Sequence, residues 1–95
     1  MKKEEIIKKM LEIKPYLQQN YATKKIGLFG SFADGTYTND SDIDLIVEFE
    51  RPIGWHFFTL EKFLEKTLGR KIDLVTTNAV KEQIKPYILN QIQYI

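Results

Sequence analysis

Residues 42–50, with the sequence DIDLIVEFE, alternate between two kinds of side chain, and this pattern limits most what the chain can fold into. One set is apolar and consists of Ile43, Leu45, Val47 and Phe49. The other set is mostly acidic and consists of Asp42, Asp44, Ile46, Glu48 and Glu50. Because successive side chains of a strand point to opposite faces, this period of two predicts a strand with one buried face.

Two further segments carry apolar residues at helical spacing. Residues 3–20 predict a surface helix packed on a core. Pro15 within it predicts a kink or two short helices, because proline lacks a backbone donor and disfavours a helical conformation in the residue before it. Residues 54–69 predict a second helix that ends at a glycine. The tail from Ala79 predicts a third helix, broken or restarted near Pro86.

Short apolar runs at residues 26–29 and 70–77 predict two more strands beside residues 42–50. About a dozen residues join the first two strands, which favours antiparallel pairing over a helical crossover. The third strand needs the helix at 54–69 to reach the sheet. The order of elements predicts an α/β (α+β) fold with a small mixed sheet of about three strands and flanking helices. The length of 95 residues and 43% hydrophobic content predict a single domain over residues 1–95.

The overall charge nearly cancels, with 14 basic and 13 acidic residues, so neither direct nucleic-acid binding nor membrane attachment is expected. The distribution is uneven, because residues 26–50 hold six acids and no base. The chain has no cysteine, and its charged N-terminus lacks the apolar core of a signal peptide. A soluble cytoplasmic protein is the expectation.

Asp42 and Asp44 are the first candidates for a metal site. One residue separates them on a strand, so both carboxylates project from the same face about 6.5 Å apart. Such oxygen ligands can hold one or two Mg²⁺ ions that clamp a phosphoryl group. Asp73, in the sequence KIDLV, would put a third acid on a neighbouring strand. The alternative is a solvated strand face, although aspartate is depleted in strands.

Gly30 and Ser31 follow the first predicted strand. A Gly-Ser turn into a short helix can direct backbone N–H groups and a hydroxyl at a phosphate. The alternative is an ordinary turn between a strand and a helix in which Ser31 is the N-cap. No Gly-Lys-Ser/Thr follows, so the segment is not a Walker loop.

Together these residues form a longer motif: Gly30-Ser31, ten residues, then Asp42-x-Asp44. This motif resembles the hallmark of the minimal nucleotidyltransferases, the MNT family within the DNA polymerase β-like nucleotidyltransferase superfamily. The resemblance extends through IGLFGS, SDIDLIVEFE and LGRKIDLVT and so covers nearly the whole chain.

The resemblance implies a polymerase β-like core and a role for each matching residue. Asp42 and Asp44 match the metal-binding aspartates, Asp73 matches the third acidic position, and Gly30 and Ser31 match the contacts to the nucleotide phosphates. The implied reaction is attack of an acceptor hydroxyl on the α-phosphate of ATP, with pyrophosphate leaving and two Mg²⁺ ions assisting. Asp73 could act as a ligand, as a general base or as both.

One residue departs from the family pattern. Relatives read Ala-Arg-Gly after the Gly-Ser pair, whereas this chain has Ala33-Asp34-Gly35. An arginine there would stabilise negative charge that develops during transfer. The departure therefore bears on catalytic efficiency and on activity itself.

The resemblance also implies a partner. Larger nucleotidyltransferases carry further domains that hold the acceptor, so here another molecule is expected to present it. Stand-alone MNT proteins are similar to antitoxins of HEPN ribonuclease toxins, which adenylylate a toxin tyrosine. The alternative is a non-catalytic antitoxin that neutralises its partner by binding, and Asp34 supports it. A third hypothesis is a structural domain whose acids only solvate a sheet face.

Three other features have simpler expectations. His56 is the only histidine and is expected at the surface or as a cap. The aromatic residues of segment 55–63 are expected in the core. Apolar residues crowd the C-terminal segment 87–95 beyond what one helix face can bury, so we expect some of them to contact a partner or a second copy.

Overall fold

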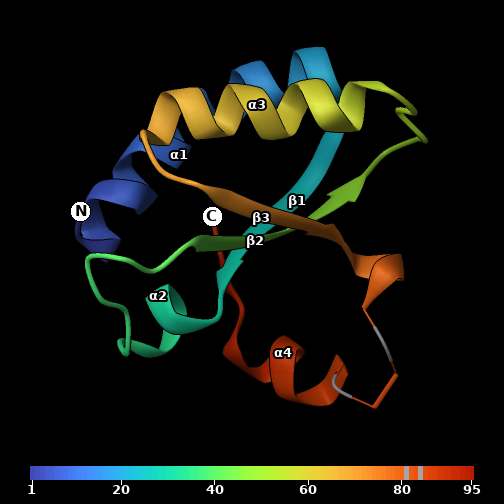
Figure 1. Cartoon of the computed structure of the whole chain (residues 1–95). Helices are drawn as coiled ribbons and strands as arrows, with labels where there is room; N and C mark the ends of the chain where they lie inside the picture. The colour runs from blue at the N-terminus through green and yellow to red at the C-terminus, as the bar shows by residue number, and fades with distance from the viewer. Residues whose placement is uncertain (81, 84) are drawn as a thin grey trace.

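The computed structural model describes residues 1–80, 82–83 and 85–95 (Figure 1). The described helices are α1 (Lys3–Tyr21), α2 (Ser31–Asp34), α3 (His56–Leu68) and α4 (Lys85–Gln91). The strands are β1 (Thr23–Phe29), β2 (Ile43–Phe49), β3 (Ile72–Thr76) and β4 (Gln93–Tyr94), and a 3₁₀ turn spans Thr77–Ala79. No helix within these ranges is both long and apolar enough to cross a membrane.

The strands form one mixed sheet in the order β3-β2-β1-β4. β1 and β2 are antiparallel, and β2 and β3 are parallel with α3 as the crossover between them. The predicted mixed α/β class, the antiparallel pairing of the first two strands and the helix that leads to the third strand are confirmed. The sequence predicted about three strands, and the additional strand is the two-residue β4, which pairs with β1 at Gly27 and Leu28.

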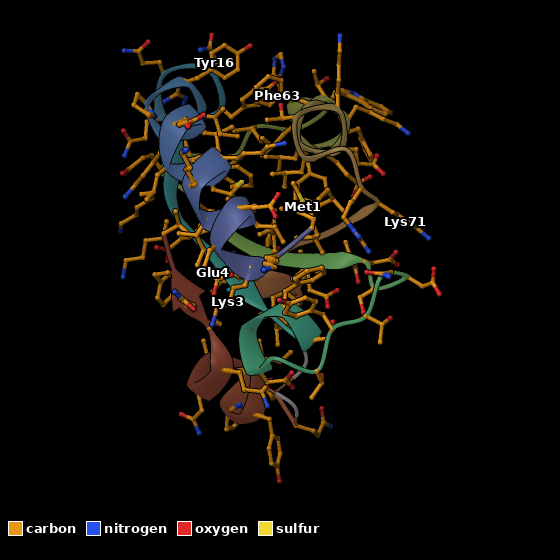
Figure 2. The ribbon with its side chains drawn as sticks, turned by 90° about the vertical axis from the view of Figure 1, so that its left-hand side faces the viewer. Met1, Lys3, Glu4, Tyr16, Phe63 and Lys71 are labelled. Atoms are coloured by element: carbon orange, nitrogen blue, oxygen red, sulfur yellow. The ribbon has the colours of Figure 1, made fainter. Side chains whose placement is uncertain are left out.

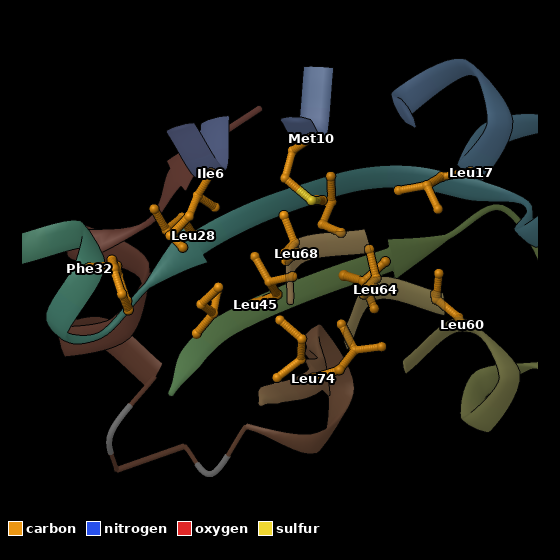
Figure 3. Close-up of a cluster of buried hydrophobic side chains, with 14 of the residues drawn as sticks. Ile6, Met10, Leu17, Leu28, Phe32, Leu45, Leu60, Leu64, Leu68 and Leu74 are labelled. Carbon is orange, nitrogen blue, oxygen red and sulfur yellow. The ribbon is translucent and has the colours of Figure 1, made fainter. Parts of the chain in front are cut away.

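The core lies between one face of the sheet and the helices α1 and α3 (Figures 1 and 3). The helices contribute Ile6, Met10, Leu17, Leu60, Leu64 and Leu68. The strands contribute Ile26, Leu28, Ile43, Leu45, Val47, Ile72 and Leu74. Each large aliphatic side chain buried in this way stabilises the fold by about 1.5 to 3 kcal/mol. The alternation in residues 42–50 therefore orients β2 as predicted, with its acids on the opposite face.

Pro15 does not divide α1, which continues from Lys3 to Tyr21. The prediction of two short helices was therefore wrong. Proline leaves the carbonyl oxygen of the residue four positions earlier, Leu11, without its helical donor. Both residues are exposed, so water can satisfy that oxygen. Tyr16 stacks on Phe63 of α3 with ring centroids 4.8 Å apart, and this contact secures the helix beyond the proline (Figure 2).

The C-terminal tail was predicted as a helix from Ala79, broken or restarted near Pro86, and α4 begins beside that proline, at Lys85. After α4 the chain extends into β4 beside β1, which was not predicted. Gly27 permits this approach, because a Cβ atom there would overlap Cγ2 of Ile92. The backbone N–H of Ile95 donates to the carbonyl oxygen of Ile26 at 3.0 Å. Lys81 and Ile84, which belong to the predicted helix, lie outside the described residues.

Two further predictions can be compared with the burial of side chains. His56 is exposed at the start of α3, as expected. The aromatic residues of segment 55–63 divide into two groups: Phe57 and Phe63 pack against the core, whereas Trp55 and Phe58 are 85% and 59% exposed. The prediction that these aromatics are core residues is wrong for Trp55 and Phe58, because Trp55, the N-cap of α3, and Phe58, in its first turn, face solvent.

Candidate active site

Gly30 forms the turn between β1 and α2. Its φ and ψ angles of 70° and −149° lie in a region that is essentially restricted to glycine. Gly30, not Ser31, is the N-cap of α2, and its carbonyl oxygen accepts hydrogen bonds from the N–H groups of Ala33 and Asp34. The alternative of Ser31 as a capping residue is therefore wrong. Ser31 begins the helix, and its hydroxyl is available for another partner.

The Gly30 turn lies directly against Asp44 of β2. A Cβ atom on Gly30 would overlap Oδ2 of Asp44, and the residue before it, Phe29, pairs with Asp44 in the sheet register. The absence of a side chain at position 30 thus brings the Gly-Ser turn and one predicted metal ligand into contact. The two halves of the sequence motif meet here.

Asp44 and Asp73 are direct partners in the parallel pairing of β2 with β3. Neighbouring strands lie about 4.8 Å apart, and both side chains are on the face opposite the core. Asp42 lies one residue before β2 and is exposed, with its Oδ2 4.0 Å from Nζ of Lys71. Lys71 itself projects into solvent at the edge of the molecule (Figure 2). The structure thus holds Asp44 and Asp73 by strand register and Asp42 by the preceding loop.

The three carboxylates interact electrostatically at Asp44. The pKa of Asp44 is raised to about 6, first by burial and then by the negative charges of Asp73 and Asp42. A half-buried carboxylate beside two others is a donor set for a hard cation such as Mg²⁺, because the cation would relieve their mutual repulsion. In the part of the chain that the structure describes, no three ligating side chains already converge in metal-binding geometry.

Asp34, the departure from the family pattern, is the last residue of α2. Its Oδ1 accepts hydrogen bonds from the N–H group and the hydroxyl of Thr36, at 2.9 and 2.6 Å. These bonds lower the pKa of Asp34 below its usual value. The acid therefore has a local role in the turn that ends α2, a use of aspartate that is common in turns.

Sequence reasoning missed two basic residues that hold α2 and the loop after it. Nζ of Lys3 in α1 donates to the carbonyl oxygen of Ala33 at 3.2 Å (Figure 2). Arg70, between α3 and β3, donates to the loop that precedes Asp42. Neither contact has a signal in the sequence, because both join residues about 30 positions apart.

A hollow of about 500 Å³ lies elsewhere, at the other ends of β2 and β3. It is lined by Val47 to Gly54, Phe57 and Thr76 to Asn78. The predicted site residues are not part of this lining. The candidate active site is instead an open part of the sheet face, bordered by the Gly30 turn.

Three features define the fold and site of a nucleotidyltransferase: a mixed sheet, a Gly-Ser turn into a short helix, and carboxylates on two adjacent strands. The family called Nucleotidyltransferase domain matches residues 5–95. The chain is 36% identical over 93 residues to protein adenylyltransferase MntA of Thermococcus cleftensis, covering 97% of this chain and 94% of that protein. The chain belongs to the nucleotidyltransferase domain family and is an enzyme of the nucleotidyltransferase class.

Solved structures share the fold. A structure described as a minimal nucleotidyltransferase superimposes with a TM-score of 0.84 at 24% identity, covering 98% of this chain and 95% of that chain. A toxin-antitoxin crystal structure with AMP-PNP gives 0.69 at 24% identity, covering 99% and 72%. A complex of tri-AMPylated Shewanella oneidensis HEPN toxin with MNT antitoxin gives 0.67 at 21% identity, covering 94% and 70%.

Proposed function

We propose that this protein transfers AMP from ATP to a hydroxyl group, a tyrosine, of a HEPN ribonuclease toxin and thereby acts as its antitoxin. The observation that carries this proposal is the contact of the Gly30-Ser31 turn with Asp44, which is itself paired with Asp73. That arrangement places possible phosphate donors next to carboxylates that can hold Mg²⁺. Residues 1–95 would act as one domain in this role.

Each residue of the site has a task in the proposed transfer. Gly30 and Ser31 would bind the nucleotide phosphates through the backbone and the hydroxyl. Asp42, Asp44 and Asp73 would hold one or two Mg²⁺ ions. Mg²⁺, when bound, neutralises the carboxylates and polarises the α-phosphate. These residues would thus orient the α-phosphate for attack by a hydroxyl that the partner presents.

The bonds of this transfer balance without another reactant. The oxygen of the acceptor hydroxyl bonds to the α-phosphorus, and the bond from that phosphorus to the bridging oxygen breaks. Pyrophosphate leaves with the bonding electron pair. The exposed carboxylate of Asp73 would take the hydroxyl proton, either as a ligand that also acts as a base or as a base alone.

The comparisons support this proposal over the non-catalytic alternative. The relative from Thermococcus cleftensis is named for protein adenylyltransferase activity, and the neighbouring complexes contain an ATP analogue or an AMPylated HEPN toxin. The alternative was based on Asp34 in the place of an arginine. Since Asp34 is bonded to Thr36 within its own turn, its presence has a structural reason that does not require loss of catalysis.

Transfer can be measured directly by mass. The protein is mixed with the product of its neighbouring gene, ATP and Mg²⁺, and a HEPN partner is expected to gain AMP on a tyrosine. The matched control is the double variant Asp42→Asn, Asp44→Asn, which should still bind the partner without modifying it. Absence of transfer by the unchanged protein, with a tight complex and silenced toxin, would favour neutralisation by binding alone.

The exposed side of α4 is the second contact surface in this proposal. β4 and the packing of Ile95 against the core occupy part of the predicted C-terminal contact segment. Tyr87 and Leu89 stay 72% and 42% exposed. We expect the variant Tyr87→Ser, Leu89→Ser to weaken binding of the HEPN partner or of a second copy by about tenfold without loss of stability. Light scattering measures association with a second copy, and titration measures the affinity for the HEPN partner. Unchanged values of both would exclude this surface as a contact site.

A further inference from the structure

Arg70 joins three parts of the site that are distant in sequence. It follows Gly69, whose φ of 68° ends α3, and it lies two residues before the start of β3. Its Nη2 donates to the carbonyl oxygen of Asn39 at 2.7 Å and to that of Ser41. One guanidinium nitrogen therefore holds two carbonyl oxygens of the loop that leads into Asp42.

The same guanidinium also contacts α2. Its central carbon lies 5.6 Å from the ring centroid of Phe32, which is fully buried in α2. Phe32 in turn stacks on Tyr37 of the loop, with centroids 4.4 Å apart and an angle of 11° between the rings. Arg70 thus rests on the helix that follows the Gly-Ser turn while it binds the loop that precedes the aspartates.

This arrangement matters most for Asp42. Asp44 and Asp73 are fixed by the hydrogen bonds of β2 and β3, whereas Asp42 lies before the strand and is exposed. The loop before it is closed by small polar contacts, such as the bond from the N–H of Thr38 to Oγ of Ser41 at 2.9 Å. Exposed contacts of this kind are weak in water. The bond from Arg70 to the carbonyl oxygen of Ser41 holds the backbone before Asp42, and the bond from the N–H of Ile43 to the carbonyl oxygen of Lys71 holds the backbone after it.

We propose that Arg70 is a positioning residue of the transferase site: it holds the loop 36–41, and through it the carboxylate of Asp42, in place for Mg²⁺ and the nucleotide. This inference rests on the proposed function for its catalytic part. Arginine suits the task better than lysine, because a planar guanidinium can serve two carbonyl oxygens and stack on a ring at once. An ammonium group offers neither the fixed donor geometry nor the flat face.

The test compares Arg70→Met and Arg70→Lys with Arg51→Met, which removes the other arginine, an exposed one in the β2–α3 connection. Hydrogen exchange of the metal-free protein is followed at the amides of Thr38, Asp40 and Ser41. A titration with Mg²⁺ alone follows the thermal stability. AMP transfer is then measured at saturating ATP and at varied Mg²⁺.

Both Arg70 variants should exchange these three loop amides faster, while the amides of β1 and β2 keep their protection. The stabilisation by Mg²⁺ should weaken. The kcat of AMP transfer should fall by about tenfold or more, as expected when a group of the active site is displaced by up to about 1 Å. Arg51→Met should behave like the unchanged protein in all three measurements. Arg70→Lys keeps the test decisive if Arg70→Met does not fold.

Two results would overturn the inference. One is loop exchange and an Mg²⁺ response in both Arg70 variants equal to those of the unchanged protein. The other is a loss of protection spread over the whole sheet, which would make Arg70 a general stabilising residue. The exchange and Mg²⁺ measurements need no transfer. Failure of the proposed function would therefore appear as an unchanged protein that does not transfer AMP. Failure of this inference would appear as one of the two results above in a protein that does transfer AMP.

Discussion

Replacement of Asp44 by asparagine is expected to abolish AMP transfer and, at the same time, to stabilise the metal-free protein. Asparagine keeps the size of the side chain and removes the charge that a divalent cation would bind. Loss of a metal ligand removes several kcal/mol of transition-state stabilisation, so transfer should fall by about 10³-fold or more. In the metal-free protein the negative charge of Asp44 is unfavourable, because burial, Asp73 and Asp42 all raise its pKa, to about 6.

The effect on stability has a defined pH dependence. In the folded protein Asp44 holds its proton up to a pKa of about 6, whereas an unfolded aspartate releases it near pH 4. Between these values the folded state binds more protons, so stability of the unchanged protein falls as the pH rises from about 4 to about 6. Because Asp44 is half-exposed, water screens part of this effect, and we expect about 1 to 2 kcal/mol.

Thermal unfolding at several pH values in the absence of Mg²⁺ measures this difference. At pH 7 the melting temperature of Asp44→Asn should exceed that of the unchanged protein by about 4 to 8 °C per kcal/mol. The difference should vanish below about pH 4. The matched control is Asp40→Asn, an exposed acid in the loop before β2, which should change neither transfer nor stability. A less stable Asp44→Asn protein at pH 7 would contradict the electrostatic account.

Replacement of Gly30 by alanine is the second change with a large expected effect. The new Cβ would overlap Oδ2 of Asp44, and the backbone conformation at Gly30 is one that alanine rarely adopts. Such a conformation costs a residue with a side chain about 1 to 3 kcal/mol. Relief of the overlap must move either the Gly-Ser turn or Asp44. Both movements separate the phosphate-binding turn from the carboxylates, so transfer should be lost along with part of the stability.

Gly35→Ala provides the matched control at the other end of α2. Gly35 also has a positive φ, of 86°, but a Cβ atom there would meet nothing within 4 Å. It should therefore lose about 1 kcal/mol of stability and keep most of its transfer activity. Chemical denaturation and the mass assay measure the two quantities for both variants. Equal loss of activity in both would show that backbone strain, not the contact with Asp44, is responsible.

The alternation of residues 42–50 predicted the buried face of β2, and the helical spacing predicted α1 and α3, because both patterns report burial on one side of a regular element. The alternative of two short helices at Pro15 was wrong because propensity cannot tell that a proline lies on the solvent side of a helix. The exposure of Trp55 and Phe58 was missed because hydrophobicity alone does not say which side chains at the start of α3 face solvent.

The spacing from Gly30-Ser31 to Asp42-x-Asp44, together with strand alternation, was enough to predict the family, the fold class and the candidate site residues from the sequence alone. These features are local, since periodicity and motif spacing are properties of short stretches. The tertiary structure alone decided that Asp44 and Asp73 are register partners, that Gly30 lies against Asp44, and that Arg70 reaches the loop before Asp42. Those contacts join residues brought together only when the strands pair and the helices pack.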